Sequence, residues 1–160
     1  VTITAAAVLV MVAAVIWWTF SRRQKVAYPF QSKAVMSDAE QRFYSVLAKN
    51  IPEGALLLSK VRLADFLEVI PGTENRMAYF GRISQKHADF LLVAEATAEP
   101  LLVVELDDST HRRNARTMES DAVKNRIYAS AGLPILRVRA RARYDGEELS
   151  QQVLAALNGE

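Results

Sequence analysis

The first twenty residues contain no charged side chain and are mostly apolar, so every charged residue lies further along the chain. At about 1.5 Å per residue, twenty helical residues span about 30 Å, which is the thickness of the apolar core of a bilayer. Trp17 and Trp18 stand where an interfacial aromatic belt would lie. This pattern predicts one transmembrane signal anchor over residues 1–21.

A basic stretch follows this apolar segment, with Arg22, Arg23 and Lys25 close together. The positive-inside rule then predicts a single-pass protein whose C-terminal part lies in the cytoplasm. A cleaved signal peptide is the alternative, but its charges would precede the apolar run and its cleavage site would need small residues. Residues 22–35 include Pro29 and have no clear periodicity, so we expect a juxtamembrane linker there.

The pattern over residues 36–160 predicts a second, folded domain. Ser37 and Glu40 form a capping box that predicts a helix to about residue 50. Apolar runs predict strands at 55–63, 88–94, 100–106 and 135–138, and the third of these is apolar on both faces, as in a central strand. Helical spacing predicts helices at 116–131 and 147–157, while 64–69 suggests a short helix or turn and 71–75 a loop. This order predicts an α/β fold with a mixed sheet flanked by helices.

Composition narrows the possible chemistry. The chain has no cysteine, two histidines and a formal net charge of +2. Cysteine-ligated metals are therefore excluded, and a histidine-rich site is not expected. A metal site would be built mainly from carboxylate oxygens, which suit Mg²⁺, Ca²⁺ or Mn²⁺.

Three acidic residues adjoin the two central predicted strands. Asp89 precedes an apolar run, Glu105 ends the next run, and Asp107 follows two residues later on the same face. If these strands pair as a hairpin, Asp89 comes near Glu105, and such converging carboxylates can hold a divalent cation. Each acid alone could simply mark where its strand leaves the core. The three together favour a site.

The motifs around these acids resemble a known family. The segments 80–90 (FGRISQKHADF), 105–111 (ELDDSTH), 121–124 (DAVK) and 131–134 (AGLP) are similar to a bacterial family of unknown function, number 2726. That family is related to the very-short-patch repair endonucleases, and Asp89 with Glu105 resembles the PD-(D/E)XK signature of restriction-endonuclease-like nucleases. The resemblance extends over roughly residues 36–157.

The resemblance implies a nuclease-like domain that hydrolyses phosphodiester bonds with Mg²⁺ or Mn²⁺, and the predicted anchor would hold it at the bacterial inner (cytoplasmic) membrane. Asp89 and Glu105 would hold the ion, helped by the carbonyl of Leu106. Asp107 stands where the signature has a lysine and could be a further metal ligand, in which case Lys124 or Lys86 could supply the cation. The alternative is a catalytically inactive nuclease fold that binds nucleic acid or a protein at the membrane.

Three further residues each allow two interpretations. Glu40 either serves only the capping box or adds an acid to the site from the first helix. His111 is either a surface residue or a general base near the metal. Lys124 either forms an exposed pair with Asp121 or takes part in catalysis.

Arg137 and Arg139 alternate along the last predicted strand, with Arg141 and Arg143 in line if the strand continues that far. Together with Arg112, Arg113 and Arg116 they suggest a contact with nucleic acid, for which DNA is the expected partner. A charged edge strand explains the same alternation. Cleavage of both DNA strands would call for two active sites, so a dimer is also possible.

Overall fold

The computed structural model describes residues 2–21, 28–107 and 115–159. The chain divides into two compact units, Val1–Lys33 and Ala34–Glu160. The first unit contains the helix α1 (Thr2–Ser21). Within the described ranges, no helix is both long and apolar enough to cross a membrane. The transmembrane part of the predicted fold is therefore not supported.

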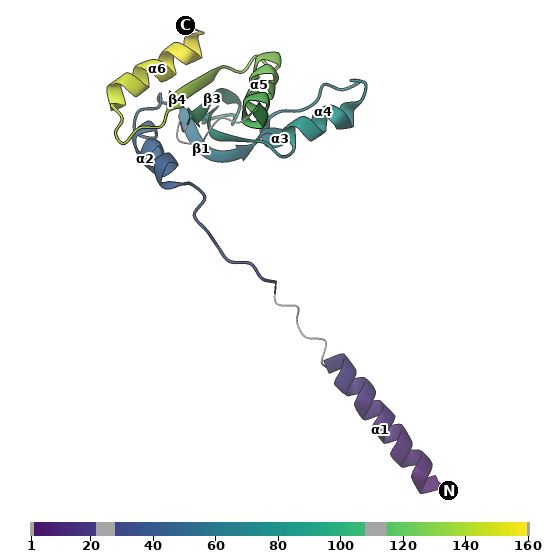
Figure 1. The fold of residues 1–160 in the computed structure, drawn as a ribbon. Helices are drawn as coiled ribbons and strands as arrows, with labels where there is room; N and C mark the ends of the chain where they lie inside the picture. The colour runs from purple at the N-terminus through teal and green to yellow at the C-terminus, as the bar shows by residue number, and fades with distance from the viewer. Residues whose placement is uncertain (1, 22–27, 108–114, 160) are drawn as a thin grey trace. The chain divides into compact units, whose positions relative to one another are not determined.

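The second unit is built on a four-stranded mixed sheet (Figure 1). Its strands are β1 (Ala55–Arg62), β2 (His87–Ala94), β3 (Pro100–Asp107) and β4 (Ile135–Arg139), in that spatial order. β1, β2 and β3 are antiparallel, whereas β4 runs parallel to β3. A parallel neighbour needs a long crossover, and α5 (Ala115–Ser130) lies in the connection between β3 and β4. The predicted mixed α/β fold is confirmed.

Helices cover both faces of this sheet. On one face, α2 (Asp38–Leu47) and α6 (Gly146–Asn158) pack on the strands. The buried residues of that cluster are Phe43, Leu47, Phe90, Leu92, Leu102, Val104, Val138, Leu149 and Val153. On the other face lie α5 and the short helix α3 (Leu63–Phe66). The buried residues there are Leu63, Ile83, Ala88, Leu91, Val93, Val103, Tyr128 and Leu133. Consecutive residues of β3 thus enter opposite cores, which is why its sequence is apolar without alternation.

One helix was not predicted from the sequence. α4 (Arg76–Ile83) lies at one end of the domain, beyond α3 (Figure 1). Its large apolar residues Met77, Tyr79 and Phe80 are exposed, and Ile83 is its buried residue. At eight residues, with Gly81 among them, α4 is shorter than the window of about 11–18 residues over which apolar periodicity identifies a helix.

The last strand is shorter than one of the predictions required. β4 ends at Arg139, and the backbone N–H of Arg141 donates to the hydroxyl of Tyr144 instead of to a neighbouring strand, at 2.9 Å. The alternation of arginines therefore stops at Arg139. The prediction that Arg141 and Arg143 could continue the row on one strand face is wrong.

Candidate functional site

Four charged residues form a row across the sheet, one from each strand. The register pairs Glu105 of β3 with Arg137 of β4. One step beyond the pair Phe90–Val104, the same register places Asp89 of β2 opposite Glu105. Lys60 of β1 follows Ser59, the register partner of Phe90, so it lies opposite Asp89. The order across the sheet is lysine, aspartate, glutamate, arginine.

The carboxylate of Asp89 is held at both oxygens. Its Oδ1 accepts a hydrogen bond from Lys60 Nζ at 2.9 Å, and its Oδ2 accepts one from the backbone N–H of Leu106 at 3.1 Å. The second bond joins β2 to β3 immediately beside Glu105. The predicted proximity of Asp89 and Glu105 is therefore present in the structure.

Glu105 is the buried charged residue of the described core, with 5% of its surface exposed. Lys124 Nζ lies 2.5 Å from Glu105 Oε1, and the Tyr128 hydroxyl donates to the same oxygen at 3.1 Å. Burial raises the pKa of Glu105, and the nearby charge of Asp89 adds to the rise, while Lys124 and Tyr128 oppose it. Two carboxylates on adjacent strands thus repel each other in a partly desolvated environment.

The helix α5 supplies both partners of Glu105. Lys124 and Tyr128 are four residues apart, so they project from one face of the helix toward the sheet. The Tyr128 side chain is fully buried. This burial and the negative charge of Glu105 both raise the pKa of the Tyr128 hydroxyl. The Lys124 side chain is only 13% exposed. The interpretation of Lys124 as half of an exposed surface pair does not fit this burial.

Glu40 takes part in the capping box and also reaches the site. Its Oε2 accepts from the backbone N–H of Ser37 at 2.7 Å, and the Ser37 hydroxyl accepts from the Glu40 N–H, so the predicted capping box is confirmed. Its Oε1 contacts Lys60 Nζ, which in turn contacts Asp89. Burial alone would raise the pKa of Glu40, but the hydrogen bonds from Lys60 and Ser37 outweigh it and lower that pKa.

Lys60, like Tyr128, is a site residue that the sequence did not reveal. Burial alone would lower the pKa of its ammonium, but Glu40 and Asp89 outweigh burial and raise it. The only sequence signal was a lysine inside an otherwise largely apolar strand, 55–63 (ALLLSKVRL). Such a residue usually belongs to a solvated face, so it did not stand out.

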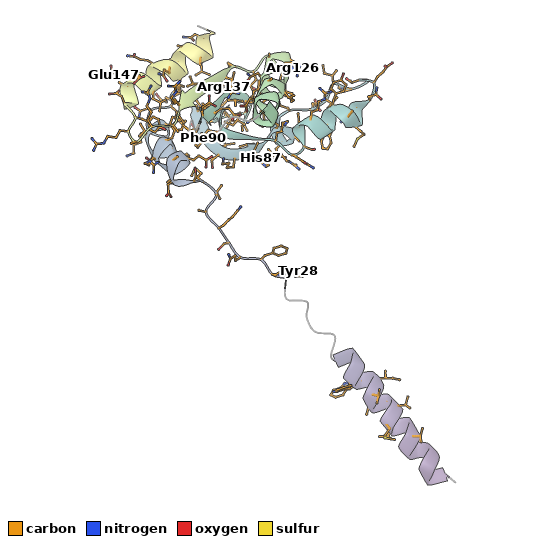
Figure 2. All side chains as sticks on the ribbon, viewed as in Figure 1. Tyr28, His87, Phe90, Arg126, Arg137 and Glu147 are labelled. Atoms are coloured by element: carbon orange, nitrogen blue, oxygen red, sulfur yellow. The ribbon has the colours of Figure 1, made fainter. Side chains whose placement is uncertain are left out.

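Asp107 is oriented toward β4. Its Oδ1 lies 3.1 Å from Nη1 of Arg137, which is labelled in Figure 2. Nη2 of Arg137 donates to Oδ1 of Asn125, in α5, at 2.9 Å. Across the described ranges, no three acidic or histidine side chains gather into a group that could hold a metal ion. The three-carboxylate site with Asp107 as third ligand is thus not supported, and Asp89 with Glu105 is the remaining pair.

Four of the predicted site residues lie wholly or partly outside the described residues. His111, Arg112 and Arg113 are outside them, and so is the side chain of Arg116.

Two further predicted residues lie at the ends of strands. Arg139 is exposed at the end of β4. Lys86 precedes β2, where its backbone N–H donates to Ile83 and its carbonyl accepts from Leu63.

The fold and the site define an α/β protein with a charged row at the centre of a four-stranded mixed sheet. Residues 32–157 match the model of the family described as Protein of unknown function (DUF2726). Because that match covers most of the chain, the protein belongs to this family. Neither a curated protein nor a solved structure matches the chain.

Proposed function

We propose that residues 36–160 form a nuclease-like domain that hydrolyses phosphodiester bonds of nucleic acid with Mg²⁺ or Mn²⁺. The observation that carries this proposal is the placement of two carboxylates, Asp89 and Glu105, on adjacent central strands, close enough that the charge of Asp89 adds to the rise that burial causes in the pKa of Glu105. The resemblance of the surrounding motifs to the PD-(D/E)XK signature supports the same reaction class. DNA as the substrate, a dimer and the membrane location stay predictions.

A site with two carboxylates suits a Mg²⁺ ion that keeps several water ligands, and it is less suited to a metal ion whose ligands all come from the protein. Mg²⁺ is commonly bound by one or two carboxylates, with water and substrate phosphate completing its octahedron. Burial raises the pKa of Glu105 and the charge of Asp89 adds to the rise, and a cation between the two carboxylates would relieve their repulsion. When bound, the ion would polarise a phosphate and activate a water.

The protein's own residues would orient this pair and stabilise charge. The Leu106 N–H fixes the Asp89 carboxylate, and Tyr128 fixes that of Glu105. Lys124 Nζ lies 2.5 Å from Glu105 Oε1, and it would supply the ammonium group that the signature has at position 107 and this chain lacks. In that role it would stabilise the negative charge that develops on the phosphate during cleavage. Arg139, exposed at the end of β4, would contact the backbone of a nucleic acid.

A catalytically inactive binding module is the second candidate, and a specific observation favours it. Each acid of the row already has a basic partner, Lys60 for Asp89 and Lys124 for Glu105, and Asp107 beside the row pairs with Arg137. A row neutralised in this way could be purely structural. The charged surface would then bind nucleic acid or a protein without cleaving it.

Cleavage assays separate these two candidates. The full chain would be incubated with duplex DNA, single-stranded DNA and RNA, with Mg²⁺, Mn²⁺ or chelator. We expect cleavage that needs the ion and falls at least about a hundredfold in Glu105→Gln and Asp89→Asn, because a metal ion contributes several kcal/mol to such reactions. Glu95→Gln, at an exposed residue after β2, is the matched control and should leave cleavage unchanged. Equal cleavage by Glu105→Gln and the unsubstituted protein would indicate a contaminant and contradict the proposal.

A further inference from the structure

Lys60 holds an unusual backbone conformation within its strand. Its φ is +55°, in the left-handed region that side chains other than glycine rarely adopt. Strain of this kind persists only where the surroundings impose it, and it is frequent at functional sites. Here the surroundings are two acids from different elements, Glu40 of α2 and Asp89 of β2.

We propose that Lys60 is a positioning residue that, through its contact with Oδ1 of Asp89, sets the affinity of the Asp89–Glu105 pair for a divalent ion. This inference rests on the proposed function, because it needs that pair to bind an ion. It adds that the ion competes with an internal ammonium group. The lysine that matters at Asp89 then comes from β1, whereas Lys124 serves Glu105 from α5.

The hydrogen bonds of Asp89 indicate why the two cations compete. Oδ2 accepts from the backbone of β3, so this oxygen is tied to the sheet. Oδ1 accepts from Lys60 Nζ at 2.9 Å. An ion that takes Oδ1 as a ligand must meet a positive charge already in hydrogen-bonding contact with that atom.

Glu40 makes the exchange possible without leaving a charge unpaired. Lys60 Nζ contacts Glu40 Oε1 as well as Asp89, so it keeps one carboxylate partner when it releases the other. Glu40 is itself fixed by the capping box at the start of α2. The release needs a rotation of the flexible lysine side chain and no movement of the strand. A lysine with Asp89 as its single partner would be harder to displace.

The size of the competition follows from Coulomb's law. In a solvent-like dielectric, one positive charge about 5 Å from a divalent ion weakens ion binding by on the order of tenfold. Lys60 is about one-third exposed, so this solvent-like limit is the appropriate one. Removing its charge should therefore tighten binding of the ion by on the order of tenfold.

Calorimetric titration of the full chain with Mn²⁺ tests this inference. Lys60→Met should bind Mn²⁺ about tenfold more tightly than the unsubstituted protein, and Lys60→Arg, which keeps the charge, should stay within about threefold of it. Lys49→Met removes the same charge from an exposed position after α2 and should leave the affinity unchanged. Equal or weaker binding by Lys60→Met overturns the inference alone. Absence of Mn²⁺ binding in every protein overturns the proposed function with it.

A second measurement uses the unsubstituted protein and so does not depend on the folding of a variant. The rate at which an amine-reactive reagent modifies Lys60 would be followed by mass spectrometry, with and without saturating Mn²⁺. We expect Mn²⁺ to raise the rate at Lys60 by about twofold or more, because one of its two carboxylate contacts is released, and to leave the rate at Lys49 unchanged. An unchanged rate at Lys60 would contradict the proposed exchange.

Discussion

The ion pair between Lys124 and Glu105 makes a strong prediction about stability. Both side chains are largely buried, at 13% and 7% exposed, and their atoms lie 2.5 Å apart. Lys124→Met keeps most of the volume of the side chain but removes its charge. Glu105 is then left as a buried carboxylate with Tyr128 as its hydrogen-bond donor. We expect the variant to fold with a reduced free energy of unfolding.

The loss should depend on pH in a defined direction. Removing one partner of a buried pair costs about 3–5 kcal/mol while the other stays charged. The pKa of Glu105 is already raised above its ordinary value of 4.5, and Lys124 is one of the groups that oppose the rise. A raised pKa gives stability that is present below 4.5 and lost as pH increases through the folded-state value. We therefore expect a loss of about 3 kcal/mol at pH 8 and a smaller loss at pH 5, because the raised pKa of Glu105 favours uptake of a proton, which removes the unpaired charge.

Urea denaturation at these two pH values measures both losses. The double variant Glu105→Gln/Lys124→Met is the control, because glutamine still accepts from Tyr128 but carries no charge to desolvate. It should recover most of the stability lost at pH 8 and should show little difference between the two pH values. A loss in Lys124→Met that is equal at pH 5 and pH 8, or that the double variant does not relieve, would refute the electrostatic argument.

Three smaller effects follow from the same structure. In thermal unfolding, Lys60→Gly should be more stable than Lys60→Ala by about 0.5–1 kcal/mol, because glycine adopts a positive φ without strain. Both variants lose the ion pairs of Lys60, so equal stability of the two would contradict backbone strain at this position. Tyr128 should stay un-ionised in an alkaline absorbance titration while exposed tyrosines ionise, so Tyr128→Phe should show an unchanged curve up to the onset of unfolding. Asp145 accepts from two N–H groups at the start of α6, and Asp145→Ala should cost about 1 kcal/mol in urea denaturation, whereas no loss would contradict its capping role.

The sequence predicted those elements whose apolar pattern matches their burial. The four strands and the helices α2, α5 and α6 were expected within a few residues of their observed bounds, because the apolar residues of each follow the spacing typical of its type. Gly132, with φ +66°, follows α5 as expected of a helix end. α4 was missed because it is only eight residues long and contains Gly81.

The site was predictable only where its residues are close along the chain. Asp89 and Glu105 were placed together because a hairpin joins their strands. Lys60 comes from β1 and Glu40 from α2, and their meeting at Asp89 depends on the tertiary fold. The pairing of Asp107 with Arg137 likewise required the parallel addition of β4, which alternation within a single strand does not specify.

The central claim is that a divalent cation binds between Asp89 and Glu105. Calorimetric titration of the full chain with Mn²⁺ tests it most directly, alongside Asp89→Asn, Glu105→Gln and Asp107→Asn. The account predicts binding to the unsubstituted protein and to Asp107→Asn, because Asp107 pairs with Arg137 away from the pair, and its loss in the other two variants. Binding that survives both Asp89→Asn and Glu105→Gln, or no binding to the unsubstituted protein, would contradict it.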